Sequence, residues 1–150
     1  MNSISQTSEQ LLPSLRSDER AAHILVVDDL PANTRVLEDL LTRDGYRVTV
    51  AGDGERALEV VTQEHPDLVL LDILMPKMDG YEVCRRLKSD PSTRLIPVVI
   101  MTSSREERDV LESYKLGVNS YVVKPMDFES FSAAVAELGH YWLLVNHEPK

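Results

Sequence analysis

Three carboxylates that each follow a short apolar run are the residues of this sequence best suited to chemistry. Asp28 and Asp29 follow the run Ile24–Val27, and Asp72 follows the run Leu68–Leu71. If the two runs are neighbouring strands, the three acids converge and repel one another. A hard divalent cation relieves this repulsion, and Mg²⁺ prefers carboxylate and water ligands. The three acids therefore predict a magnesium site.

Two further polar residues extend the candidate site toward phosphoryl transfer. Thr102 and Lys124 also follow apolar runs, over residues 98–101 and 120–123. Phosphoryl transfer depends on positioning and on charge neutralisation, and a carboxylate can be the nucleophile that forms an aspartyl phosphate. Asp72 is the candidate nucleophile because it stands alone after its run. Thr102 would donate a hydrogen bond to one phosphoryl oxygen, and Lys124 would neutralise another.

Each of these residues alone has a plainer explanation. The pair Asp28-Asp29 could cap a following helix, because acids are favoured at helix N-termini. Asp72 could be a loop residue, Thr102 a strand-end cap and Lys124 a solvated lysine. Their joint placement after four separate apolar runs favours a common site.

Two hydrophobic periods alternate along the chain and predict the elements that position these residues. Apolar runs predict strands at 24–27, 47–51, 68–71, 98–101 and 120–123, and helical spacing predicts helices at 31–43, 54–64, 80–89, 105–116 and from about 127. Strands that are apolar throughout and separated by helices are typical of a parallel sheet covered on both faces. The expected fold is therefore α/β, a doubly wound (βα)5 sheet. In such sheets ligands bind at the carboxyl ends of strands, where the five polar residues fall.

Composition excludes several other classes of function. The chain has 25 Asp and Glu against 16 Lys and Arg, a formal net charge of −9. This balance disfavours nucleic-acid binding and a polybasic membrane anchor. No apolar run reaches the roughly 18 residues of a transmembrane helix, and no secretory signal is recognisable. The single cysteine, Cys84, is expected in the core and fits a reducing compartment, so we expect a cytoplasmic protein with no membrane or nucleic-acid partner.

Only one domain is expected in the 150 residues. Residues 1–20 are polar and interrupted by Pro13, which predicts a mobile N-terminal arm. Residues 21–145 form the domain with an extended C-terminal helix, and residues 146–150 form a tail.

Four segments make the sequence resemble the receiver domains of two-component response regulators, over residues 23 to about 140. They are ILVVDDLPANTRVLEDLL, PDLVLLDILMPKMDGYEVCRRLK, IPVVIMTSS and GVNSYVVKPMD. The resemblance implies a flavodoxin-like fold with strand order 2-1-3-4-5. It also implies a stand-alone response regulator that is not a conventional enzyme. Such a protein takes a phosphoryl group from a sensor histidine kinase and passes the signal to a downstream protein or phosphotransfer partner.

The resemblance also implies a role for each residue of the site. Asp72 is the phosphoacceptor, Asp29 binds Mg²⁺ directly, Asp28 binds it mostly through water, and the backbone carbonyl of Leu74 is a further ligand. The remaining roles are the switch hydroxyl of Thr102, the phosphate-binding lysine Lys124, the aromatic switch residue Tyr121, and a cis peptide bond between Lys124 and Pro125.

The side chain of Leu74 bears on two questions of reactivity. In the family, the residue two positions after the phosphoacceptor tunes attack of water on the acyl phosphate. Leucine cannot orient that water, so slow self-dephosphorylation is expected. Aspartate-nucleophile phosphatases usually place a second Asp there for proton transfer, and Leu74 disfavours that alternative. A receiver-like module that only binds a partner, without phosphorylation, remains the alternative function.

The apolar segment 141–145 predicts an interface. Its five residues cover the whole circumference of a helix, whereas a surface helix needs only one apolar stripe. A twin subunit or another protein could cover it, and so could a fold of the tail back onto its own domain. HYWLLVN and VLESYKLGVNSYVVKP resemble the small receivers paired with bacterial phytochrome-type histidine kinases. That resemblance implies a homodimer that uses the face of the fourth helix, fifth strand and fifth helix. The apolar segment adds Tyr141, Trp142 and Leu144 as the expected dimer or partner contacts.

Overall fold

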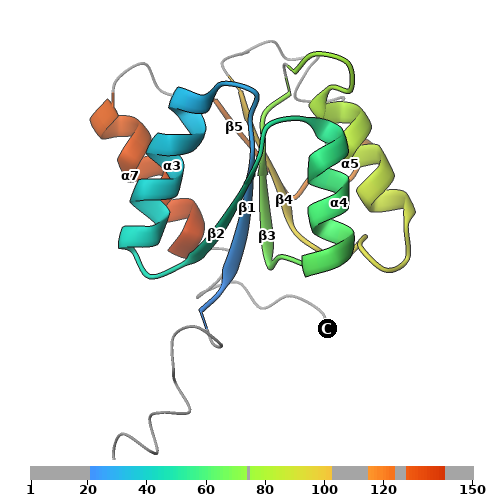
Figure 1. The fold of residues 1–150 in the computed structure, drawn as a ribbon, viewed down its shortest axis with the longest axis horizontal. Helices are drawn as coiled ribbons and strands as arrows, with labels where there is room; N and C mark the ends of the chain where they lie inside the picture. The colour runs from blue at the N-terminus through green and yellow to red at the C-terminus, as the bar shows by residue number, and fades with distance from the viewer. Residues whose placement is uncertain (1–20, 74, 103–114, 124–127, 141–150) are drawn as a thin grey trace, which may run out of the picture.

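The computed structural model of the protein describes residues 21–73, 75–102, 115–123 and 128–140. The elements in chain order are β1 (His23–Val27), α3 (Pro31–Arg43), β2 (Arg47–Ala51), α4 (Gly54–Glu64), β3 (Leu68–Leu71), α5 (Gly80–Ser89), β4 (Val98–Thr102), β5 (Ser120–Val123) and α7 (Phe128–His140). All neighbouring strands are parallel, in the order β2-β1-β3-β4-β5 (Figure 1). The predicted doubly wound sheet and its strand order are confirmed.

Helices cover both faces of the sheet, α3 and α7 on one side and α4 and α5 on the other (Figure 1). Successive strand residues alternate between two core clusters, because side chains of a strand point to opposite faces. In β1, Leu25 and Val27 pack in the cluster beneath α4 and α5, while Ile24 and Val26 pack in the cluster beneath α3 and α7. This two-sided burial explains why β3 is apolar at every position and why β1 and β4 are apolar at all but one of theirs.

The helices α4 and α5 begin in the same way. Asp53 is the N-cap of α4, and its side chain accepts a hydrogen bond from the backbone N–H of Arg56 at 2.8 Å. Asp79 is the N-cap of α5 and accepts from the N–H of Glu82 at 3.0 Å. A side-chain oxygen at this position satisfies one of the free N–H groups of the first turn.

Several sequence predictions concern residues that the structure does not describe. The arm at 1–20, the extension with Tyr141, Trp142 and Leu144, and the tail at 146–150 lie outside the described residues, as does most of the predicted helix at 105–116. Val135 of α7 is 1% exposed and packs in the cluster beneath α3 and α7. No helix among the described residues is long and apolar enough to span a bilayer.

Candidate functional site: an acidic cluster at the strand ends

The pairing of β1 with β3 brings the three predicted acids together. Val27 is aligned with Leu71 at the last step of the register. The backbone pairing continues one residue further, because the N–H of Asp72 donates to the carbonyl of Val27 at 3.0 Å. One carboxylate oxygen from each of Asp28, Asp29 and Asp72 lies within 4.8 Å of the other two. The expected convergence at the carboxyl ends of the strands is therefore present.

The cluster is largely shielded from water. Asp28 is 3% exposed, Asp72 is 9% exposed and Asp29 is partly exposed. Buried carboxylates are costly unless they are paired, hydrogen-bonded or bound to a cation. Three oxygen ligands of this charge and spacing fit a hard divalent cation such as Mg²⁺.

Asp28 also contacts the start of α3, but it does not cap the helix, because the N-cap is Leu30 and no side chain makes the cap hydrogen bond. Its Oδ1 accepts from the N–H of Leu30 at 3.0 Å, and its Oδ2 accepts from Nδ2 of Asn33 at 3.1 Å. Both oxygens are thus oriented by the protein. Sequence reasoning missed Asn33, although an amide in the first turn after an acidic pair was a usable signal.

The segment between Asp72 and α5 is tied to the fold at several points. Ile73 is 5% exposed and Met75 is 8% exposed, and both pack in the cluster beneath α4 and α5. The N–H of Gly80 donates to the carbonyl of Ile73 at 2.9 Å. Between them Lys77 adopts a left-handed conformation with φ of 65°. The phosphoacceptor candidate is thereby connected to the first turn of α5.

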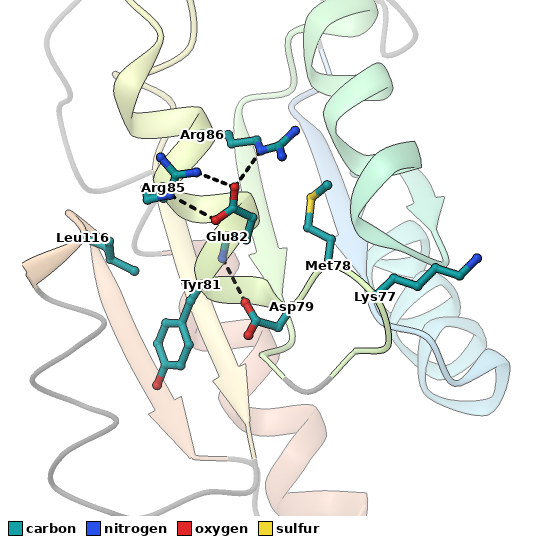
Figure 2. Close-up of a pocket in the computed structure, with 8 residues that line it drawn as sticks. All are labelled: Lys77, Met78, Asp79, Tyr81, Glu82, Arg85, Arg86 and Leu116. Atoms are coloured by element: carbon teal, nitrogen blue, oxygen red, sulfur yellow. Dashed lines mark hydrogen bonds and ion pairs between the residues drawn. The ribbon is translucent and has the colours of Figure 1, made fainter.

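The end of this segment and the first turns of α5 together line a groove of about 540 Å³ (Figure 2). Its lining comprises Lys77, Met78, Asp79, Tyr81, Glu82, Arg85, Arg86 and Leu116. Glu82 accepts hydrogen bonds from Nε of Arg85 at 3.0 Å and from Nε of Arg86 at 2.8 Å. These two hydrogen bonds lower the pKa of Glu82 to about 2. Tyr81 is partly buried and packs against the core cluster beneath α4 and α5.

The other predicted site residues are described only in part. Thr102 is the last residue of β4, and its backbone is aligned with Val123. Tyr121 lies in β5, aligned with Ile100. The remaining predictions concern Leu74, Lys124 and Pro125, which lie outside the described residues.

Comparison with known proteins gives one family. The family described as "Response regulator receiver domain" matches residues 24–136. Response regulator PleD of Caulobacter vibrioides is 43% identical over 126 residues, which are 84% of this chain and 28% of that protein. The probable transcriptional regulator ycf27 of Cyanophora paradoxa is 42% identical over 115 residues, 77% of this chain and 47% of that protein. The chain thus spans less than half the length of each of these relatives.

Solved structures agree with this family. The phosphorylated cyanobacterial phytochrome response regulator RcpA is 33% identical, with a TM-score of 0.80 over 87% of this chain and 99% of its own. The Mn²⁺-bound form of response regulator Rcp1 is also 33% identical, with a TM-score of 0.78 over 86% of this chain and 99% of its own. By the match over residues 24–136 and the identity to these relatives, the chain belongs to the response regulator receiver family.

Proposed function

We propose that this protein is a response regulator that accepts a phosphoryl group from a sensor histidine kinase on Asp72. The observation that supports the proposal most strongly is the cluster of Asp28, Asp29 and Asp72 at the carboxyl ends of β1 and β3. Asp72 is assigned as the acceptor because it is the single aspartate that directly follows the central strand β3, whereas two aspartates follow β1. Asp28 is committed to Leu30 and Asn33 through its two oxygens.

The metal site of the proposal consists of Asp28, Asp29, Asp72 and the backbone carbonyl of Leu74. Mg²⁺ bound there supplies positive charge next to the phosphoryl oxygens. Asp29 would contact the metal directly and Asp28 mostly through water, which agrees with the two hydrogen bonds that hold the Asp28 oxygens. The Mn²⁺-bound form of Rcp1 is a related protein with a divalent ion bound.

The transfer itself is a substitution at phosphorus. A carboxylate oxygen of Asp72 forms a bond to phosphorus while the bond from phosphorus to the donor histidine nitrogen breaks, and the nitrogen keeps the electron pair. The product is an acyl phosphate on Asp72. Thr102 donates its hydroxyl to one phosphoryl oxygen and Lys124 neutralises another, with the Lys124-Pro125 bond in the cis form. Leu74 cannot orient a water molecule, so the phosphoryl group is lost slowly.

Phosphorylation acts as a switch in the proposal. It adds negative charge at the carboxyl ends of the strands, and Thr102 and Tyr121 move in response. The surface that changes is an interface of this chain with itself or with a downstream protein or phosphotransfer partner. The structural likeness to RcpA, a phytochrome response regulator, supports a phytochrome-type kinase as the phosphoryl donor. The proposal further takes the regulator to be stand-alone and cytoplasmic and to dimerise through Tyr141, Trp142 and Leu144. Trp142→Ala combined with Leu144→Ala is expected to give a monomer by light scattering, and an unchanged mass would contradict the dimer.

The central experiment is phosphorylation with a small donor. The full chain is incubated with Mg²⁺ and acetyl phosphate, and its intact mass is compared with that of Asp72→Asn and of the control Asp79→Asn, which changes a surface acid outside the cluster. We expect a gain of one phosphate in the parent and the control, no gain in Asp72→Asn, and loss of the reaction with EDTA. A folded parent that gains no phosphate would refute the proposal and favour the binding module.

A further inference from the structure

Two helices of this protein begin with the same dipeptide, Asp-Gly, yet the two glycines lie in different surroundings. In α4 the N-cap is Asp53 and the first helical residue is Gly54, and in α5 these positions are Asp79 and Gly80. Each aspartate accepts the N–H three residues later, and both glycines are buried. The two helix starts are therefore a natural matched pair.

A side chain at the two glycines would meet different kinds of atom. A Cβ at Gly54 would lie 3.0 Å from side-chain atoms of Met78 and Val83. A Cβ at Gly80 would lie 2.4 Å from the carbonyl oxygen of Asp72 and 2.8 Å from the Cα of Ile73. Side-chain atoms can shift by a few tenths of an ångström, whereas the contacts of Gly80 are with the backbone of the phosphoacceptor itself.

Backbone conformation does not account for Gly80. Its φ lies outside the left-handed region, in contrast to that of Gly45 and Gly117, so other residues could adopt its conformation. In a helix, alanine is favoured over glycine. What requires glycine at position 80 is space, because the first turn of α5 rests directly on residues 72 and 73. The hydrogen bond from its N–H to the carbonyl of Ile73, at 2.9 Å, fixes the same contact.

We propose that Gly80 is a positioning residue for Asp72. Because it has no side chain, the capped start of α5 packs against the backbone of Asp72 and Ile73, and this contact holds the Asp72 carboxylate in the acidic cluster. The backbone of Asp72 is held from the other side by its hydrogen bond to Val27. A Cβ at position 80 must displace the Asp72 backbone, the start of α5, or both. This inference rests on the proposed function for its effect on phosphoryl transfer, but its structural part does not.

The glycine pair tests the proposal directly. The rates at which Gly80→Ala and Gly54→Ala react with acetyl phosphate are measured at saturating Mg²⁺. The temperature is one at which circular dichroism shows both variants to be folded. Under this condition a loss of stability alone does not change the rate. A misplacement of the order of 1 Å can lower a rate by about a hundredfold. We expect the rate constant of Gly80→Ala to fall by about tenfold to a hundredfold and that of Gly54→Ala to stay within about twofold of the parent. A folded Gly80→Ala that reacts at the parental rate overturns the proposal.

If Gly80→Ala does not fold, the two N-cap residues Asp79 and Asp53 provide a second test of the proposal. Asp79→Ala and Asp53→Ala each remove one equivalent cap, so the two variants are expected to lose similar stability. We expect Asp79→Ala to slow phosphorylation more than Asp53→Ala, because only α5 holds the backbone of Asp72. Asp79→Asn keeps the cap, removes the charge and should restore the rate. Equal rates for the two alanine variants would overturn the proposal.

A separate measurement distinguishes failure of this inference from failure of the proposed function. The affinity for Mg²⁺ and the amide NMR shifts of Asp72 and Ile73 require no phosphoryl transfer. If the parent takes no phosphate, the proposed function fails. The positioning is then supported by a larger change of these two quantities in Gly80→Ala than in Gly54→Ala. Equal or absent changes would refute it.

Discussion

Acidification is expected to destabilise this protein through one buried imidazole at the start of β1. His23 is 3% exposed, and its Nε2 lies 2.7 Å from Oγ1 of Thr49. The Thr49 hydroxyl donates to Oε1 of Glu64 at 3.1 Å, so Nε2 must carry the proton and donate to Thr49. Nδ1 is buried and has no hydrogen-bond partner among the described residues. A second proton on the ring would therefore be placed where no acceptor is available.

The surroundings of His23 determine the sign of the effect. Burial lowers the pKa of His23 most, the positive charge of Arg47 lowers it further, and Glu64 and Asp67 raise it by smaller amounts. The folded pKa thus lies below that of the unfolded chain, which is about 6.5. Near pH 7.5 the ring is neutral in both states and contributes no pH dependence. As the pH falls below 6.5 the unfolded chain binds the proton first, so stability is lost until the pH reaches the folded pKa.

Linkage gives the size of this loss. One proton bound by the unfolded chain alone changes the free energy of unfolding by about 1.4 kcal/mol per pH unit. The parent and His23→Gln are compared by urea unfolding at pH 7.5, 6.5, 5.5 and 4.5. Glutamine retains a donor for Oγ1 of Thr49 but cannot titrate. The other three histidines and all carboxylates are common to both proteins, so the difference between them isolates His23.

The expected result is that the parent loses more stability than His23→Gln as the pH falls from 6.5. Glutamine can lower stability at pH 7.5 through poorer packing, but that cost is present at every pH. A stability difference between the two proteins that stays constant from pH 7.5 to 4.5 would refute the reasoning.

Three further predictions follow from single residues. Lys77→Gly should raise the free energy of unfolding by about 0.5–1 kcal/mol, because glycine adopts a φ of 65° without strain. Urea unfolding measures this change. An equal gain for Lys77→Ala would contradict backbone strain as its cause. In carbon-13 NMR the Glu82 carboxyl should titrate near pH 2. Its pKa should rise toward the usual value in Arg85→Gln and in Arg86→Gln. An unperturbed pKa in the parent would argue against the hydrogen bonds of Glu82 with the two arginines. Burial raises the pKa of the Cys84 thiol to about 11. Ellman's reagent at pH 8 should therefore react slowly with the native protein and quickly with the protein unfolded in urea. A fast reaction of the native protein would be inconsistent with the buried position of Cys84.

The local sequence pattern was enough to predict most of the helices and strands. The strand Leu68–Leu71 and the helices Pro31–Arg43 and Gly80–Ser89 have the bounds that spacing predicted, because hydrophobic period and turn residues act over a few neighbours. The core position of Cys84 followed from the same period and is confirmed.

The candidate site was likewise predicted in part from the sequence and decided in part by the tertiary structure. The sequence by itself determined which residues could form it, since Asp28, Asp29 and Asp72 each follow a strand and parallel strands place such residues at one edge. Only the tertiary structure decided that their oxygens lie within 4.8 Å of one another, because that depends on β1 and β3 being neighbours in register.

The contact of Gly80 with the backbone of Asp72 and the burial of His23 against Thr49 and Glu64 likewise belong to the tertiary structure. Both arise where an element packs against a segment remote in sequence or across a loop. Spacing along the chain specifies which face a residue occupies. It does not specify how closely another backbone approaches that face, which is determined by packing.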